Sequence, residues 1–221
     1  PDYILYSDQD DVWFENKIEV LIKSIKTHED EIGYKPILVH SNYQIVNQNL
    51  ENLFIENNRI NLDKMRKQTT INNIIFQNNI YGCTTIINRP LIKHCLKGLQ
   101  ICDNYDHWVA LNASFHGEIF YTNKKLMLYR QHLKNVTGSY LTRRPWYYKL
   151  FFIYKELNKD SRNRIFKNII ALDYFRKLDG KQCFVTIDQL TQKIYISKKI
   201  IMYCLRNRIN KNTIHETLFF Y

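Results

Sequence analysis

Apolar residues recur along the first 130 positions in two alternating patterns. Short apolar runs, typical of buried strands, are separated by stretches in which apolar residues return every three or four positions, as on one face of a helix. The runs predict strands at 3–6, 36–40, 43–46 and 84–87, and a closing pair of strands at 119–121 and 126–129. The helical spacing predicts helices at 12–28, from 69 or 70 to 77, from 89 to about 98, and after 103–106. Strands that alternate with helices predict a layered α/β domain.

Charge divides the chain into two parts. Of 221 residues, those at 1–140 include 15 basic and 15 acidic side chains, whereas those at 141–221 include 17 basic and 6 acidic ones. The whole net charge of +11 therefore belongs to the second part. This step predicts a boundary near 139–144, between an α/β part that carries the functional site and a basic, aromatic, mainly helical tail. Such a tail is expected to meet an anionic partner.

Composition narrows the class of protein. Hydrophobic residues make up 45% and charged residues 24%, which is typical of a globular chain and excludes disorder as its main state. No apolar run approaches the roughly 20 residues of a membrane-spanning helix. Five cysteines without a C-x-x-C pair predict reduced thiols and a cytoplasmic protein. The chain starts almost inside a strand, without Met or a signal peptide, so we expect it to be a fragment.

Three carboxylates follow the first predicted strand. Asp8, Asp10 and Asp11 lie in the segment Ser7-Asp8-Gln9-Asp10-Asp11-Val12-Trp13, at the carboxyl end of the strand, where open α/β sheets bind ligands. A divalent cation that prefers oxygen ligands, Mg²⁺ or Mn²⁺, would compensate this charge. The alternative is that one aspartate caps the following helix while the others face water. For Asp11 we favour the helix cap.

The same segment resembles the family 2 glycosyltransferases, which are inverting enzymes of the GT-A class. It looks most like the rhamnosyltransferase branch, which builds bacterial cell-wall and capsular polysaccharides. Further segments resemble the motifs of that family in the same order: His40-Ser41-Asn42, Tyr81-Gly82-Cys83-Thr84, Tyr105-Asp106-His107-Trp108, Leu128-Tyr129-Arg130-Gln131-His132 and Asn135-Val136-Thr137-Gly138. The resemblance covers residues 1–140.

The resemblance implies a partial, Rossmann-like GT-A domain. The opening strand, the Thr-Tyr-Asn-like turn and the Asp-Asp-Gly-Ser-like motif of the family have no counterpart here, so we expect the front third of the domain to be missing. On that basis this chain by itself would bind a nucleotide sugar weakly or not at all. The parent protein would transfer a sugar with inversion from a dTDP- or UDP-sugar, by resemblance L-rhamnose from dTDP-rhamnose, to a bacterial surface glycan or lipid-linked glycan. The alternatives are another hexose, an inactive remnant, or a basic module that binds membranes or nucleic acid.

The resemblance also implies roles for particular residues. A Mn²⁺ or Mg²⁺ ion held by Asp8 and Asp10 would stabilise the leaving diphosphate as a Lewis acid. Asp106 would be the general base, and its position at a predicted helix start favours the carboxylate; on spacing alone a helix cap is equally expected. His132 would complete the metal shell or contact the diphosphate, or face solvent. Arg130 would pair with phosphate or with an acid inside the domain.

Three residues are expected on the acceptor side. Gly82 would let the backbone approach a sugar closely, or serve as an ordinary turn glycine. His107 would orient a substrate or be structural. Trp108 would belong to the core or form a wall of the acceptor pocket.

The tail alternates cations and aromatic residues, most clearly at 143–152. One interpretation is a peripheral contact of residues 143–178 with the inner face of the plasma membrane. A second is that amphipathic helices pack their aromatic side chains on the catalytic domain. Nucleic-acid binding is the third interpretation and the least favoured.

Overall fold

The computed structural model describes residues 1–53, 69–76, 78–96 and 104–131, together with 167–168, 170–172 and 174–175. Within these residues the strands form one five-stranded sheet of order β1-β4-β3-β5-β2. The strands are β1 (Tyr3–Leu5), β2 (Val12–Trp13), β3 (Ile37–Val46), β4 (Thr85–Asn88) and β5 (Glu118–Arg130). The central strands β3 and β5 are parallel, and the other neighbouring pairs are antiparallel.

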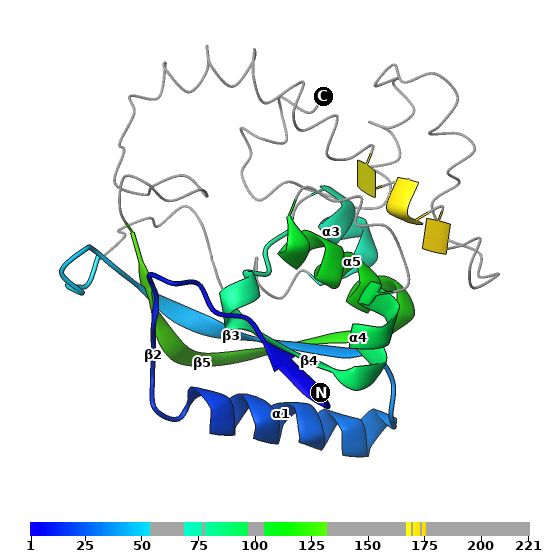
Figure 1. Ribbon diagram of the computed structural model, residues 1–221, viewed down its shortest axis with the longest axis horizontal. Coiled ribbons are helices and arrows are strands. Elements are labelled where there is room, and N and C mark those ends of the chain that lie inside the picture. Colours follow the sequence, from blue (N-terminus) through cyan, green and yellow to red (C-terminus); the bar gives the residue numbers. More distant parts are fainter. Residues whose placement is uncertain are drawn as a thin grey trace, which may run out of the picture.

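Helices cover both faces of this sheet. The helical elements are α1 (Lys17–Ile32), α3 (Ile71–Phe76), the 3₁₀ turn η1 (Gly82–Thr84), α4 (Arg89–Leu96) and α5 (Tyr105–His116). Of the described helices, α1 lies on one face, and α3, α4 and α5 lie on the other (Figure 1). The layered α/β architecture predicted from the sequence is confirmed, and α3, α4 and α5 lie where the periodicity predicted helices.

Strand β3 is buried on both faces, which explains the apolar run at 37–39. Ile37 and Val39 pack with Leu21 and Ile25 of α1, whereas Leu38 packs into the cluster formed by α3, α4 and α5. Successive side chains of a strand point to opposite faces, so the part of a strand that packs between two helical layers is apolar at successive positions.

The predicted closing pair of strands is wrong. Residues 118–130 form the single strand β5, which runs parallel to β3 along its whole length. The polar segment between the two apolar runs is absorbed by a bulge, because Ser41 pairs with Thr122 while Asn42 pairs with Lys125. Asn42 Nδ2 donates a 2.9 Å hydrogen bond to Asn123 Oδ1 at this bulge. A bulge accommodates extra residues without reversing the chain.

The helix predicted at 12–28 begins later than expected. Val12 and Trp13 form β2 and pair with Leu128 and Met127 of β5, and α1 begins only at Lys17. The apolar residues at 12 and 13 belong to the sheet, a long-range pairing that local periodicity cannot reveal. The helix extends to Ile32 and ends at Gly33, whose positive φ of 81° suits glycine.

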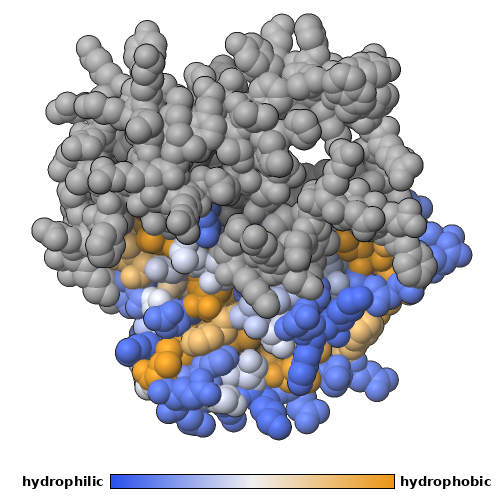
Figure 2. Space-filling model, turned by 180° about the vertical axis from the view of Figure 1, so that it is seen from behind, coloured by the Kyte–Doolittle hydropathy of each residue, from blue (hydrophilic) through white to orange (hydrophobic). Residues whose placement is uncertain are grey.

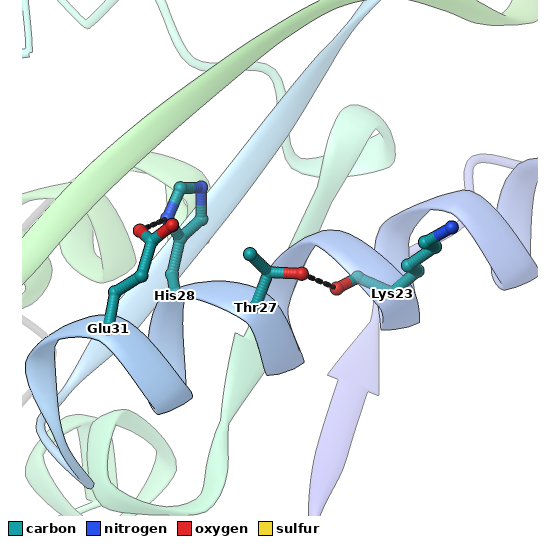
Figure 3. Close-up of polar contacts among 4 residues, drawn as sticks. All are labelled: Lys23, Thr27, His28 and Glu31. Carbon is teal, nitrogen blue, oxygen red and sulfur yellow. Dashed lines mark hydrogen bonds and ion pairs between the residues drawn. The ribbon is translucent and has the colours of Figure 1, made fainter.

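Local polar contacts link successive turns of α1. Thr27 Oγ1 donates a 3.0 Å hydrogen bond to the Lys23 carbonyl, and His28 Nδ1 lies 3.0 Å from Glu31 Oε2 (Figure 3). The His28 ring also stacks on Phe120 of β5, with 3.6 Å between ring centroids. On the face shown in Figure 2, the hydrophobic residues among those described are interspersed with hydrophilic ones.

A short part of the basic tail packs on the α/β layers. The residues described between 167 and 175 are helical, and Ala171, Leu172 and Phe175 belong to the same buried cluster as α5. The Phe175 ring lies 5.3 Å from the Trp108 ring, centroid to centroid. The predicted boundary near 139–144 lies outside the described residues. Among the described helices, none has the length and apolar character needed to cross a membrane.

Candidate functional site

The sheet topology brings the acidic residues at 8–11 next to η1, the 3₁₀ turn that begins at Gly82 and that we call the glycine turn. Strand β1 is antiparallel to β4, with Leu5 opposite Ile86, so the residues that follow β1 lie beside those that precede β4. Asp8, Asp11 and Cys83 meet there, and one potential ligand atom from each lies within 4.8 Å of the others. Residues up to 75 positions apart in the sequence thus form one cluster, which we call the carboxylate site.

Asp8 and Asp11 form the carboxylate pair of this site, whereas the sequence predicted Asp8 and Asp10. Residues 9 and 10 form a turn that returns the chain toward Asp8, and Asp10 lies outside the group of potential ligand atoms. Asp11 is not a helix cap, because α1 begins at Lys17 with Asn16 at the cap position. Its backbone leads into β2, and pairing of that strand with β5 sets its place.

The Asp11 carboxylate is poised to receive a further partner. Oδ1 accepts a 3.1 Å hydrogen bond from the Arg130 N–H at the end of β5. Oδ2 is buried and has no hydrogen-bond partner within the described residues. Desolvation raises the pKa of Asp11 to about 6, and the charges of Asp10 and Asp8 add to the rise. An orphaned, buried oxygen beside a second carboxylate fits a hard divalent cation.

Cys83 is a member of the site that the sequence reasoning missed, although it stands in the glycine motif. Its thiol lies beside both carboxylates, and burial together with the charges of Asp11 and Asp8 raises the pKa of the thiol far above its ordinary value. The group is therefore a neutral thiol and not a thiolate ligand. The oxygen atoms of Asp8 and Asp11 are the better ligands for Mg²⁺ or Mn²⁺.

Asp106 lies in the first turn of α5 and is tied to the same glycine turn. Its carboxylate accepts hydrogen bonds from the N–H of Gly82, from the Asn78 amide and, at 2.6 Å, from the N–H of His107. The cap position itself is held by Asn104, so Asp106 is not the helix cap. Desolvation raises the pKa of Asp106, with a smaller contribution from Asp8. A part-buried carboxylate with a raised pKa is suited to accept a proton.

Gly82 is required by the close approach of Tyr105. A Cβ atom at Gly82 would lie 2.6 Å from two ring carbons of Tyr105 and closer still to the hydroxyl. The Tyr105 ring is also 5.0 Å from the ring of Tyr6, and it is 40% exposed. Two aromatic rings therefore border the carboxylate site next to Asp106.

The other predicted acceptor-side residues lie deeper. His107 is buried and its Nε2 lies 2.7 Å from the Ile74 carbonyl. Trp108 is also buried, and its Nε1 donates a 3.1 Å hydrogen bond to the Cys95 carbonyl. Both side chains have the surroundings of core residues, which agrees with the structural interpretation of His107 and with the core interpretation of Trp108.

Two further predicted site residues, Arg130 and His132, belong to the segment at the end of β5. Arg130 is part-buried and contacts the site through its main-chain N–H, which binds Asp11. His132 lies outside the described residues.

A buried lysine completes the site and was also missed. Lys17 Nζ donates a 2.6 Å hydrogen bond to the Cys83 carbonyl. Burial lowers the pKa of Lys17 to about 8, while Cys83, Asp11 and Asp8 act in the opposite direction. In sequence Lys17 is an ordinary helical lysine, and no local pattern marks it as buried.

Comparison with known proteins gives one informative similarity. No family model matches the chain. The chain is 27% identical over 185 residues to the dTDP-rhamnosyl transferase RfbG of Shigella flexneri. The aligned part makes up 79% of this chain and 58% of the relative. This distant similarity supports a glycosyltransferase, and it agrees with the type of family that the sequence motifs resemble.

Proposed function

We propose that this chain carries the catalytic centre of an inverting glycosyltransferase of the GT-A, family 2 type. The observation that carries the proposal is the convergence of Asp8, Asp11 and Asp106 on the Gly82–Cys83 turn. It joins a carboxylate pair suited to a divalent cation to a separate carboxylate suited to proton transfer. The similarity to a dTDP-rhamnosyl transferase supports dTDP-rhamnose as the donor. The L configuration of the sugar and a surface glycan as the acceptor are proposed from the motifs that resemble the rhamnosyltransferase branch.

The proposed reaction is a single displacement. The acceptor hydroxyl oxygen attacks the anomeric carbon of the donor, the bond from that carbon to the diphosphate breaks, and the configuration inverts. Asp106 receives the hydroxyl proton, for which its raised pKa makes it a stronger base than an ordinary aspartate. The hydrogen bond from the Gly82 N–H orients this carboxylate.

Asp8 and Asp11 would hold Mn²⁺ or Mg²⁺ next to the leaving group. When bound, the ion would supply Lewis-acid stabilisation to the departing nucleoside diphosphate. The orphaned Oδ2 of Asp11 supports this assignment, because a buried oxygen without a partner is costly unless a ligand satisfies it. Asp11 replaces Asp10 in the proposal, since it is Asp11 that lies with Asp8.

The test is sugar transfer by the full-length protein, with dTDP-L-rhamnose compared against a panel of UDP-sugars. We expect transfer from dTDP-L-rhamnose to an isolated surface glycan. Asp106→Asn should lower turnover by roughly 10²–10⁴-fold and leave donor binding in place. Asp30→Asn makes the same change on the exposed side of α1 and should have no effect. Undiminished turnover by Asp106→Asn would refute the assignment of the base.

A further inference from the structure

Lys17 occupies a position that is unfavourable for a lysine. It is the first residue of α1, where the helix dipole repels positive charge, and its exposed fraction is 0%. Burying an ammonium group is costly unless it is paired or hydrogen-bonded. Asn16, at the cap position, makes no side-chain hydrogen bond to the helix end. Contacts with residues outside α1 must therefore offset the cost of burying the Lys17 ammonium group.

Those contacts lead directly to the glycine turn. Lys17 Nζ lies 2.6 Å from the Cys83 carbonyl oxygen, 3.3 Å from Met127 Sδ and 3.9 Å from the centroid of the Trp13 ring. The shortest contact is thus to a main-chain oxygen and not to a carboxylate. Asp11 and Asp8 are near enough to stabilise the charged form of Lys17 through space.

The Cys83 carbonyl belongs to a turn that serves two parts of the site. The Gly82 N–H donates to Asp106, and the Cys83 thiol lies beside Asp8 and Asp11. On its other side the turn is bounded by the Tyr105 ring, which packs against Gly82. A shift of this turn would move the donor to Asp106 and the thiol together.

We propose that Lys17 is a positioning residue, which holds the Gly82–Cys83 turn through the Cys83 carbonyl and so aims the Gly82 N–H at Asp106. Its contacts are with Cys83, Met127 and Trp13, so it would act on the expected base through the turn. The inference rests on the proposed function only in taking Asp106 as the base. Lys17, the buried cation beside the carboxylate site, would then do more than balance the negative charge of the carboxylates.

The test follows the ¹³C resonance of the Asp106 carboxyl against pH in the full chain, assigned by its loss in Asp106→Asn. Gly82, Asn78 and His107 donate to this carboxylate and Asp8 faces it, so its pKa reports on the turn. Lys17→Met removes the donor and keeps apolar contact with Trp13 and Met127. We expect the pKa of Asp106 to rise by about one unit. Lys17→Arg, which keeps charge and donors, should restore most of the wild-type value.

The matched control is Lys23→Met, the same substitution at an exposed position of α1. It should leave the Asp106 titration unchanged. If Lys17→Met does not fold by circular dichroism, Lys17→Gln takes its place and should also raise the pKa of Asp106. An unchanged Asp106 titration in a folded Lys17 variant would overturn the proposal, since a purely structural role alters stability and not this pKa. The titration needs no substrate, so its outcome is independent of whether the chain transfers a sugar.

Discussion

Asp11 and Arg130 are 119 positions apart in the sequence, yet the Arg130 N–H donates a 3.1 Å hydrogen bond to Asp11 Oδ1. This contact exists because β2 pairs with the end of β5. It fixes one oxygen of the carboxylate and leaves the other buried beside Asp8. A short strand at the sheet edge thereby places the residue on which the proposed metal chemistry depends.

Replacing Asp11 should show how much the buried carboxylate lowers the stability of the metal-free protein. The folded pKa of Asp11 is raised to about 6, so the native state holds its proton more tightly than the unfolded chain does. The stability due to this group is therefore present below the unfolded pKa of about 4 and is lost as the pH rises to about 6. Asp11→Asn keeps the acceptor for Arg130, and should stabilise the metal-free protein at pH 7 by about 1 kcal/mol after allowance for solvent screening. Urea unfolding at pH 4 and pH 7 measures this, and equal gains at both values would contradict it.

The choice of metal ligands can be tested separately. We expect Asp8→Asn and Asp11→Asn each to weaken Mn²⁺ binding by about tenfold or more, and Asp10→Asn to have a much smaller effect. Wild-type affinity should also fall below about pH 6, because Asp11 must lose its proton to bind the ion. Isothermal titration with Mn²⁺ on the folded variants provides the measurement. A dominant effect of Asp10 would favour the pair predicted from the sequence over the pair that the structure brings together.

The contact between Gly82 and Tyr105 predicts a coupled pair of substitutions. Gly82→Ala should destabilise the protein by about 1–3 kcal/mol, because the new methyl group collides with the Tyr105 ring. Tyr105→Ala removes the obstacle, so the cost of Gly82→Ala should be much smaller in that background. A double-mutant cycle by urea unfolding tests the coupling, and additive effects would show that the ring is not what excludes a side chain at position 82.

The packing of the tail on α5 predicts a large effect at Phe175. Its side chain is almost completely buried against Trp108, so Phe175→Ala should cost about 3–5 kcal/mol. Exposure of Trp108 should shift its fluorescence to longer wavelength. Ile170→Ala, at a position 38% exposed, is the control and should cost much less. A small effect at Phe175 would mean that this segment does not hold the α5 layer in solution.

Much of the fold could be predicted because it depends on local patterns. Periodicity located α3, α4 and α5 and the apolar runs of β1, β3 and β4, since a helix or strand between layers must present apolar residues at its own spacing. The wrong predictions concern segments whose structure is set by pairing with strands that are distant in the sequence. The turn between two predicted strands became the bulge of β5, and Val12–Trp13 joined the sheet instead of the helix.

The candidate site shows the same division. From the sequence alone, the acidic motif at 8–11, the glycine at 82 and the aspartate at 106 could be singled out by residue type and order. Only the tertiary structure decided that Asp11 and not Asp10 joins Asp8, that Cys83 lies beside them, and that Lys17 is buried against the turn. Residue types determine which chemistry is available. Which atoms meet is determined by the antiparallel pairing of β1 with β4 and of β2 with β5. The reason is that the register of strand pairing joins residues that are distant in the sequence, and no local pattern encodes it.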